Sequence, residues 1–191
     1  MLLPGSQLIG TDVLGLQTGA RLAEISDPVI DPANLKIMAY VLKGPLLSEH
    51  PSLILTNDIR ELSSIGMIVD SSDEFIGVHD VIKIEKLHEL QFNLLGMNVI
   101  DEKDHKLGKV NDYSIDSNSF VIQQLNVKRG VLKAFTETGL LIHRSQIVAI
   151  NDRTIVVHTA EKKIEPVMQA ERRTYVNPFR NSSPQPENSE I

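Results

Sequence analysis

Two pairs of aspartates, each four residues apart, have the clearest spacing for chemistry in this sequence. Asp27 and Asp31 form the first pair, and Asp112 and Asp116 form the second. A general acid and base would need both carboxyl groups of a pair in a cleft, with perturbed pKa values. Aspartates also form turns, because the carboxylate accepts a hydrogen bond from the backbone two residues further on. Since both pairs stand in equivalent contexts, we favour the turn and expect no catalytic residue.

The other motifs that carry chemistry are missing from the sequence. The six histidines include no pair four residues apart and no HExxH arrangement. Cysteine is absent, which excludes disulfides, thiolate metal ligands and a cysteine nucleophile. The glycines form neither GxGxxG nor GxxxxGK, and no GxSxG is present. We therefore expect a protein that is not an enzyme and that has no cofactor or metal site.

One basic stretch, residues 126–135, could contact phosphate or a partner. Its cations are Lys128, Arg129 and Lys133, and the lysines nearby in the sequence are Lys103, Lys106 and Lys109. Acidic residues interrupt these lysines, and nucleic-acid binding usually needs a strongly basic surface. The stretch is therefore either a phosphate- or partner-binding patch or an ordinary solvated face.

The composition favours strands and an uneven charge. Of the 191 residues 41% are apolar and only 4% aromatic, so the core must consist of Ile, Val and Leu, and the β-branched residues among them prefer strands. Residues 1–80 carry 11 acidic and 4 basic side chains, whereas residues 81–164 carry 10 and 12. No apolar run is long enough for a membrane helix, and the lack of cysteine fits a reducing compartment, so we expect a soluble cytoplasmic protein.

The sequence contains an internal repeat. At an offset of 86 residues Gly10 corresponds to Gly96, and at an offset of 85 Asp31 corresponds to Asp116. At an offset of 88 Ile59 corresponds to Ile147. Two copies are too few for an open solenoid, so each copy should be a closed unit of its own.

The local patterns within each copy predict short strands joined by tight turns. In the second copy, strands are expected to begin at Val99 and to occupy 107–116, 120–128, 140–143, 147–150 and 154–159. In the first copy, Asp31 should form a turn in which Asn34 takes the left-handed conformation. Between the copies, residues 71–93 should form a packed connector, a strand that runs into a short helical turn.

The repeated pattern resembles the PRC-barrel family. The residues that carry the resemblance are Leu94, Gly96, Val99, Leu107, Gly108, Val110, Asp112 and Asp116. The second copy matches over 93–160, whereas the first copy departs from the pattern and has Ala23 where the second has Gly108. The family includes the cytoplasmic domain of the photosynthetic reaction-centre H subunit and the C-terminal domain of the ribosome maturation factor RimM. The tandem arrangement is similar to that of a bacterial group.

The resemblance implies an all-β protein with two small PRC-type β-barrels in tandem. The expected domains are a degenerate first repeat at 5–72, a connector at 73–92, a second repeat at 93–163 and a mostly disordered tail at 164–191. It also implies an adaptor or assembly role through protein–protein interaction, with self-association as one form. The alternative is a ribosome- or RNA-associated maturation factor that binds a ribosomal particle.

Overall fold

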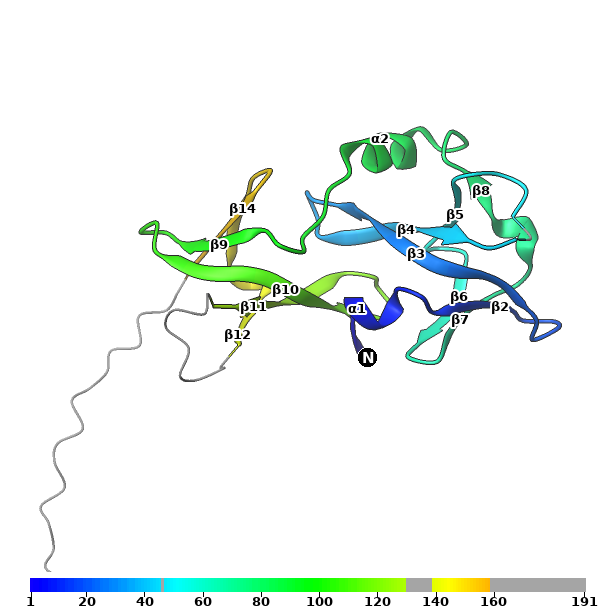
Figure 1. Cartoon of the computed structure of the whole chain (residues 1–191), viewed down its shortest axis with the longest axis horizontal. Helices are drawn as coiled ribbons and strands as arrows, with labels where there is room; N and C mark the ends of the chain where they lie inside the picture. Colours follow the sequence, from blue (N-terminus) through cyan, green and yellow to red (C-terminus); the bar gives the residue numbers. More distant parts are fainter. Residues whose placement is uncertain (46, 130–138, 159–191) are drawn as a thin grey trace, which may run out of the picture. The chain divides into compact units, whose positions relative to one another are not determined.

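A computed structural model describes residues 1–45, 47–129 and 139–158. Residues Met1–Thr159 belong to one compact unit, in which strands dominate and helices are few (Figure 1). The expectation of an all-β protein is therefore confirmed. The expected disordered tail and Lys133 lie outside the described residues. No described helix is both long enough and apolar enough to span a bilayer.

The first sheet is formed by residues from the first half of the chain. Its order is β6-β7-β2-β3-β4-β5-β8. The strands are β2 (Asp12–Gly15), β3 (Arg21–Asp31), β4 (Lys36–Lys43), β5 (Ser52–Leu55), β6 (Ile59–Ser63), β7 (Gly66–Val69) and β8 (Ile76–Gly77). The neighbouring strands β2 and β7 are parallel, and all other neighbours are antiparallel.

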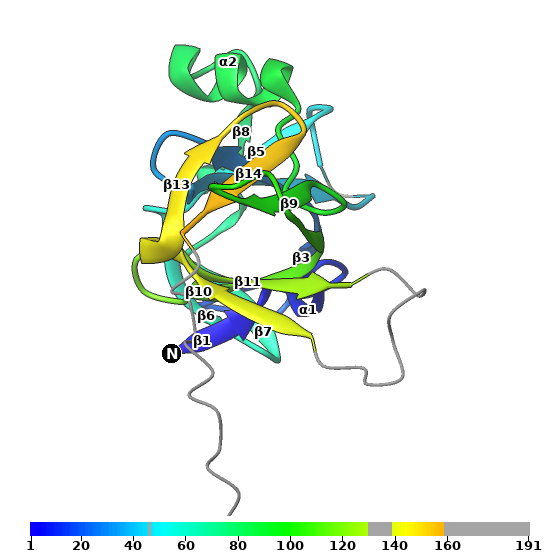
Figure 2. The same cartoon turned by 90° about the vertical axis from the view of Figure 1, so that its left-hand side faces the viewer.

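The second sheet has the order β12-β11-β10-β9-β14-β13, with β1 paired to β10 in addition. Its strands are β1 (Leu2–Pro4), β9 (Asn98–Asp101), β10 (Lys106–Asp116), β11 (Ile122–Lys128), β12 (Leu140–His143), β13 (Ile147–Ile150) and β14 (Thr154–Val157). Here β9 and β14 are the parallel neighbours, as Figure 2 shows. Short helical segments complete the fold, namely α1 (Gly5–Leu8), η1 (Ser72–Glu74), α2 (Ile82–Leu90) and η3 (Arg144–Gln146).

The two sheets correspond strand for strand. The six strands from β2 to β7 pair in the same order as β9 to β14, and the parallel pair stands at the same place in both. The long strands β3 and β10 each have two register shifts against the next strand, after Ile25 and Val29 in β3 and after Val110 and Ser114 in β10. The bulges of β3 and β10 therefore lie at equivalent positions, 85 residues apart. The two copies share these backbone irregularities as well as their strand order.

Three expectations from the sequence differ from the structure. Among the described residues the strand pairing leaves both sheets open, with β6 and β8 at the edges of one and β12 and β13 at the edges of the other, so closed tandem barrels are not observed. The strand expected within residues 71–93 is only the two-residue β8, and the apolar residues Ile82 and Ile84 belong to α2, where only Ile84 is buried. The left-handed residue of the first hairpin turn is Leu35 and not the expected Asn34, and the second hairpin has its left-handed residue at the equivalent position, Phe120.

Both sheets contribute to one apolar core. It contains Val13, Ile25 and Ile37 from the first sheet and Val99, Ile115 and Ile122 from the second, all essentially inaccessible. A smaller cluster on the opposite face of the first sheet, with Val29 and Leu53, lies under Ile84 of α2, which covers β3 in Figure 1. The connector is therefore packed, as its apolar content predicts.

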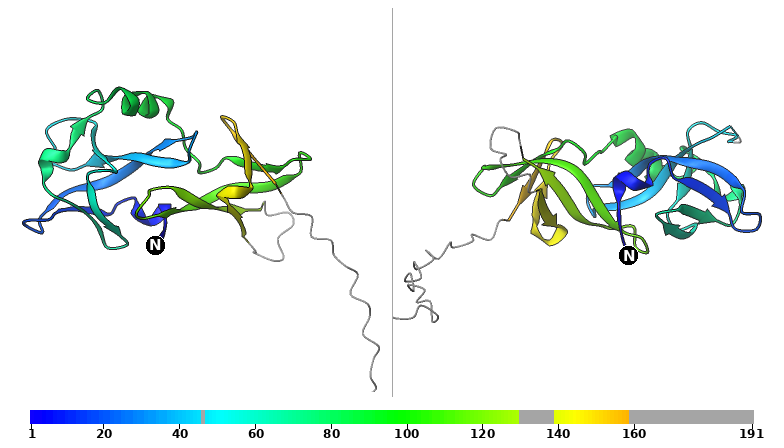
Figure 3. Two further views of the ribbon diagram at one scale, coloured as in Figure 1. Left: turned by 180° about the vertical axis from the view of Figure 1, so that it is seen from behind. Right: turned by 60° about the horizontal axis from the view of Figure 1, so that its bottom comes forward.

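The turns of the β3–β4 and β10–β11 hairpins bind each other reciprocally. Ile37 N donates to Phe120 O at 2.9 Å, and Ile122 N donates to Leu35 O at 2.8 Å. When the two copies are aligned at an offset of 85 residues, the donors of these two bonds correspond to each other, and so do the acceptors. The N-terminal residues add a second link, because β1 pairs with β10 and α1 follows beside it (Figure 3).

Candidate partner-binding site

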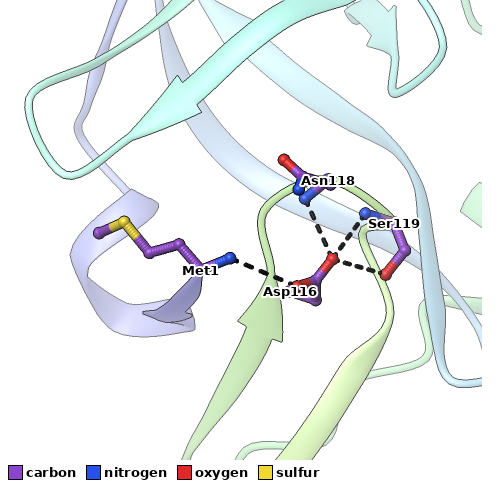
Figure 4. A network of polar contacts seen from close by, with 4 residues as sticks. All are labelled: Met1, Asp116, Asn118 and Ser119. Atoms are coloured by element: carbon purple, nitrogen blue, oxygen red, sulfur yellow. Dashed lines mark hydrogen bonds and ion pairs between the residues drawn. The ribbon is translucent and has the colours of Figure 1, made fainter.

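The aspartates Asp31 and Asp116 lie at the starts of equivalent hairpin turns. Asp31 Oδ1 accepts from Ala33 N at 3.0 Å, and its other oxygen lies 3.2 Å from Lys83 Nζ. Asp116 Oδ1 accepts from Asn118 N, Ser119 N and Ser119 Oγ, and Oδ2 lies 3.4 Å from the N-terminal ammonium (Figure 4). The two hydrogen bonds from Ser119 above all, with the one from Asn118 N and the positive charge of the N-terminus, lower the pKa of Asp116 to about 2, although desolvation opposes this. Both carboxylates thus hold turns.

The depressed pKa of Asp116 predicts a specific loss of stability in acid. Its ordinary value is 3.8, so ionised Asp116 stabilises the fold above about pH 4, and this contribution is lost as the pH falls toward 2. We expect Asp116→Asn to flatten the dependence of the free energy of unfolding on pH between these limits, measured by urea denaturation. Asp152→Asn, which removes a charge from another turn, is the control. Parallel curves for Asp116→Asn and the unmodified protein would contradict the prediction.

The other two aspartates, Asp27 and Asp112, are equivalent in sequence but differ in surroundings. Asp112 accepts from Ser6 N at 3.1 Å and from Ser6 Oγ at 2.6 Å, and so holds α1 against β10. Asp27 accepts only from Ser26 Oγ and makes no ion pair with a described residue. Neither pair of aspartates therefore forms a shared acid–base site, but Asp27 presents a carboxylate to solvent.

A groove of about 360 Å³ opens beside Asp27. Its walls come from α1, β3, the end of α2 and the segment that leads to β9. Ile9 and Leu95 line it from opposite halves of the chain, at positions equivalent in the repeat, and they are 43% and 45% exposed. Val41, Leu87 and Phe92 add apolar surface. The polar groups come from Asp27 and His88 together with the neutral side chains of Ser6, Gln91 and Asn93. This groove offers exposed apolar side chains beside an unpaired carboxylate.

Tyr113 lines the inner part of the groove. Burial raises the pKa of its hydroxyl, so the phenol is neutral in the physiological range. Gly5 packs on the same ring, because a Cβ there would lie 2.4 Å from a ring carbon. The inner part of the groove is therefore closely packed and uncharged, and its exposed apolar side chains and the Asp27 carboxylate lie at its mouth.

The remaining predicted residues fall outside this groove. Gly96 and Gly108 both have a positive φ, 82° and 152°. Lys128 ends β11 and Arg129 follows it, both exposed. Among the described residues, no three His, Cys, Asp or Glu side chains gather closely enough to hold a metal ion.

The sequence did not reveal Ile9, Leu95 and His88 as site residues. They lie in three separate segments that meet only in the folded chain. For Ile9 and Leu95 the repeat is a signal, since it aligns them as apolar residues just before Gly10 and Gly96, whereas it gives none for His88.

Residues 89–164, which span all of the second sheet except β1, match the family model of the PRC-barrel domain. The chain contains a PRC-barrel domain. No curated protein is significantly similar to the chain. The PRC-barrel domain indicates a module for protein interaction or assembly. The groove lies at one margin of this domain, because Gln91, Phe92 and Leu95 belong to the matched residues, whereas Ile9 and Asp27 precede them.

Proposed function

We propose that this chain is a non-enzymatic adaptor or assembly protein that binds another protein. The observation that carries the proposal is the groove, in which Ile9 and Leu95 are exposed beside the Asp27 carboxylate. Apolar side chains next to one unpaired charge suit a protein segment that buries apolar groups and brings a cation to Asp27. The acidic balance of residues 1–80 favours such a basic segment as well.

A photo-cross-linking residue placed at Leu95 tests this function in cells. We expect a discrete cross-linked complex with a partner protein, which mass spectrometry can identify. The same residue at Ile65, which is 89% exposed and outside the groove, is the matched control. Addition of Asp27→Lys should abolish the complex, because it replaces the carboxylate with a cation.

The control and the charge reversal decide the outcome of that experiment. A cross-link that forms equally at Ile65, or that survives Asp27→Lys, would show contact without recognition and would refute the groove as the docking site. Circular dichroism of each variant should confirm that the fold is retained.

We also infer that residues 5–72 are a diverged copy of the unit at 93–163. The shared strand order and the recurring bulges of β3 and β10 support this division. A bridging role follows, because two similar units with unlike charge can engage unlike partners. A protein without cysteine is suited to the cytoplasm, which we propose as its location.

A ribosome- or RNA-associated role is the second candidate function. It is favoured by the direct cross-strand pairing of Lys109 with Lys128 and by Arg129 beside them. Co-sedimentation with ribosomal particles over a salt series tests it, because phosphate contacts weaken steeply as salt rises. Lys128→Ala with Arg129→Ala should weaken such binding, and no association at low salt would exclude it.

A further inference from the structure

The first sheet carries a neutral network of charges on its outer face, at the start of β3. Arg21 Nε lies 2.7 Å from Asp12 Oδ1, and Arg21 Nη2 lies 2.6 Å from Glu24 Oε2. Lys43 Nζ lies 2.9 Å from the other oxygen of Glu24. Lys43 above all, with Arg21, lowers the pKa of Glu24, although burial opposes this. Two carboxylates and two cations therefore balance each other across three strands.

The second sheet has lost both carboxylates at the equivalent positions. Asp12, Glu24 and Lys43 are aligned across β2, β3 and β4, and their counterparts Asn98, Lys109 and Lys128 are aligned in the same way across β9, β10 and β11. Lys106 begins β10 as Arg21 begins β3. Cations therefore remain at this place without the acids that neutralise them.

The lysines share the outer face of the second sheet. Lys109 and Lys128 are direct cross-strand partners, and the next residues, Val110 and Val127, point into the core. Side chains directly opposite each other lie on one face about 5 Å apart, and like charges there are destabilising. Lys106, Lys109, Lys128 and Arg129 form no ion pair with any residue in the described part of the chain. This unfavourable arrangement is relieved when an anion lies across the row.

We propose that this basic row, Lys106, Lys109 and Lys128 with Arg129 beside it, binds an acidic segment of a partner protein. The proposal deepens the adaptor function, on which it rests, by giving the chemistry of a partner for the second sheet. The groove would accept a basic segment, and the row an acidic one, so the two surfaces select different occupants.

The rest of this face favours protein over nucleic acid. Beyond the row, the outer face of β11 and β12 presents Asn126 and Leu141, and Leu141 is 57% exposed. Among the described residues of this face, none is Phe, Tyr or Trp, so beyond the small ring of His143 bases would find no stacking platform.

Fluorescence anisotropy with two labelled probes tests the basic row. The probes are a glutamate-rich peptide and a single-stranded RNA of equal charge, each titrated with the full chain at low and at physiological ionic strength. We expect the peptide to bind, to bind less tightly as salt rises, and to lose about tenfold in affinity in Lys109→Glu. The matched control is Lys86→Glu, the same change at an exposed lysine of α2, which should bind as the unmodified chain does.

The variant also gives a readout of folding. The carboxylate introduced by Lys109→Glu would lie opposite Lys128 as Glu24 lies opposite Lys43, so the melting temperature should be retained or raised. Preferential RNA binding that Lys109→Glu weakens would overturn the proposal in favour of nucleic acid. No peptide binding, or equal losses in Lys109→Glu and Lys86→Glu, would overturn it outright. The cross-link at Leu95 does not depend on this row. It therefore tests the adaptor function independently of the peptide-binding experiment.

Discussion

Gly108→Ala should lower the free energy of unfolding by about 3 kcal/mol, measured by urea denaturation. Gly108 lies at a bulge of β10 with φ 152°, and the strand beside it leaves no space for a side chain. A Cβ would lie 2.4 Å from the carbonyl oxygen of Lys128 and 2.9 Å from its carbonyl carbon. Because these are backbone atoms, β10 and β11 would have to separate, and their hydrogen bonds would lengthen.

Gly96→Ala separates conformational strain from this steric conflict. Gly96 also has a positive φ, 82°, but a Cβ there meets no atom within 4 Å. Its replacement should therefore cost only the strain of a left-handed residue, about 1 kcal/mol. If both substitutions destabilise the protein equally, contact with Lys128 does not explain the requirement for glycine at 108.

Leu3→Ala should have an effect of similar size, a loss of about 3 kcal/mol in the free energy of unfolding. Leu3 is 2% exposed, pairs with Ile115 and belongs to the core to which both sheets contribute. Its truncation removes apolar contacts and leaves a cavity that the surrounding strands can fill only in part. Chemical denaturation followed by circular dichroism measures the change.

Leu2→Ala is the matched control, since it is the same substitution one residue earlier on the same strand. Leu2 is 47% exposed and points to the opposite side of β1, so we expect a change within about 0.5 kcal/mol. Comparable losses at Leu2 and Leu3 would mean that β1 contributes by backbone pairing alone, and not by burial of Leu3.

The local turns could be predicted from the sequence, because they depend on neighbouring residues. The hydrogen bonds of Asp31 and Asp116 to their own turns follow from aspartate chemistry. The exact left-handed residue could not be predicted, since tertiary contacts of the two turns place Leu35 and Phe120 there in spite of their side chains. An apolar run such as 81–84 fits a helix or a strand equally well, and packing on the first sheet decides for α2.

The two candidate surfaces required the three-dimensional structure for a different reason. The groove joins residues of α1, β3 and the segment after α2, which no local pattern connects. The basic row depends on which lysines face each other, and that follows from the register of β10 with β11. Comparison of the two copies could have indicated the row, because Glu24 is replaced by Lys109, but its meaning becomes clear only beside the ion pairs of the first sheet.

The reciprocal bonds between the hairpin turns have a consequence for how the two halves stay together. Ile37 and Ile122 each donate to the other half in the same way, as the two subunits of a symmetric dimer would. Here a peptide chain joins the partners, so their association is unimolecular and carries no translational entropy cost. Dilution cannot separate them, and the arrangement of the halves is independent of how much protein the cell makes.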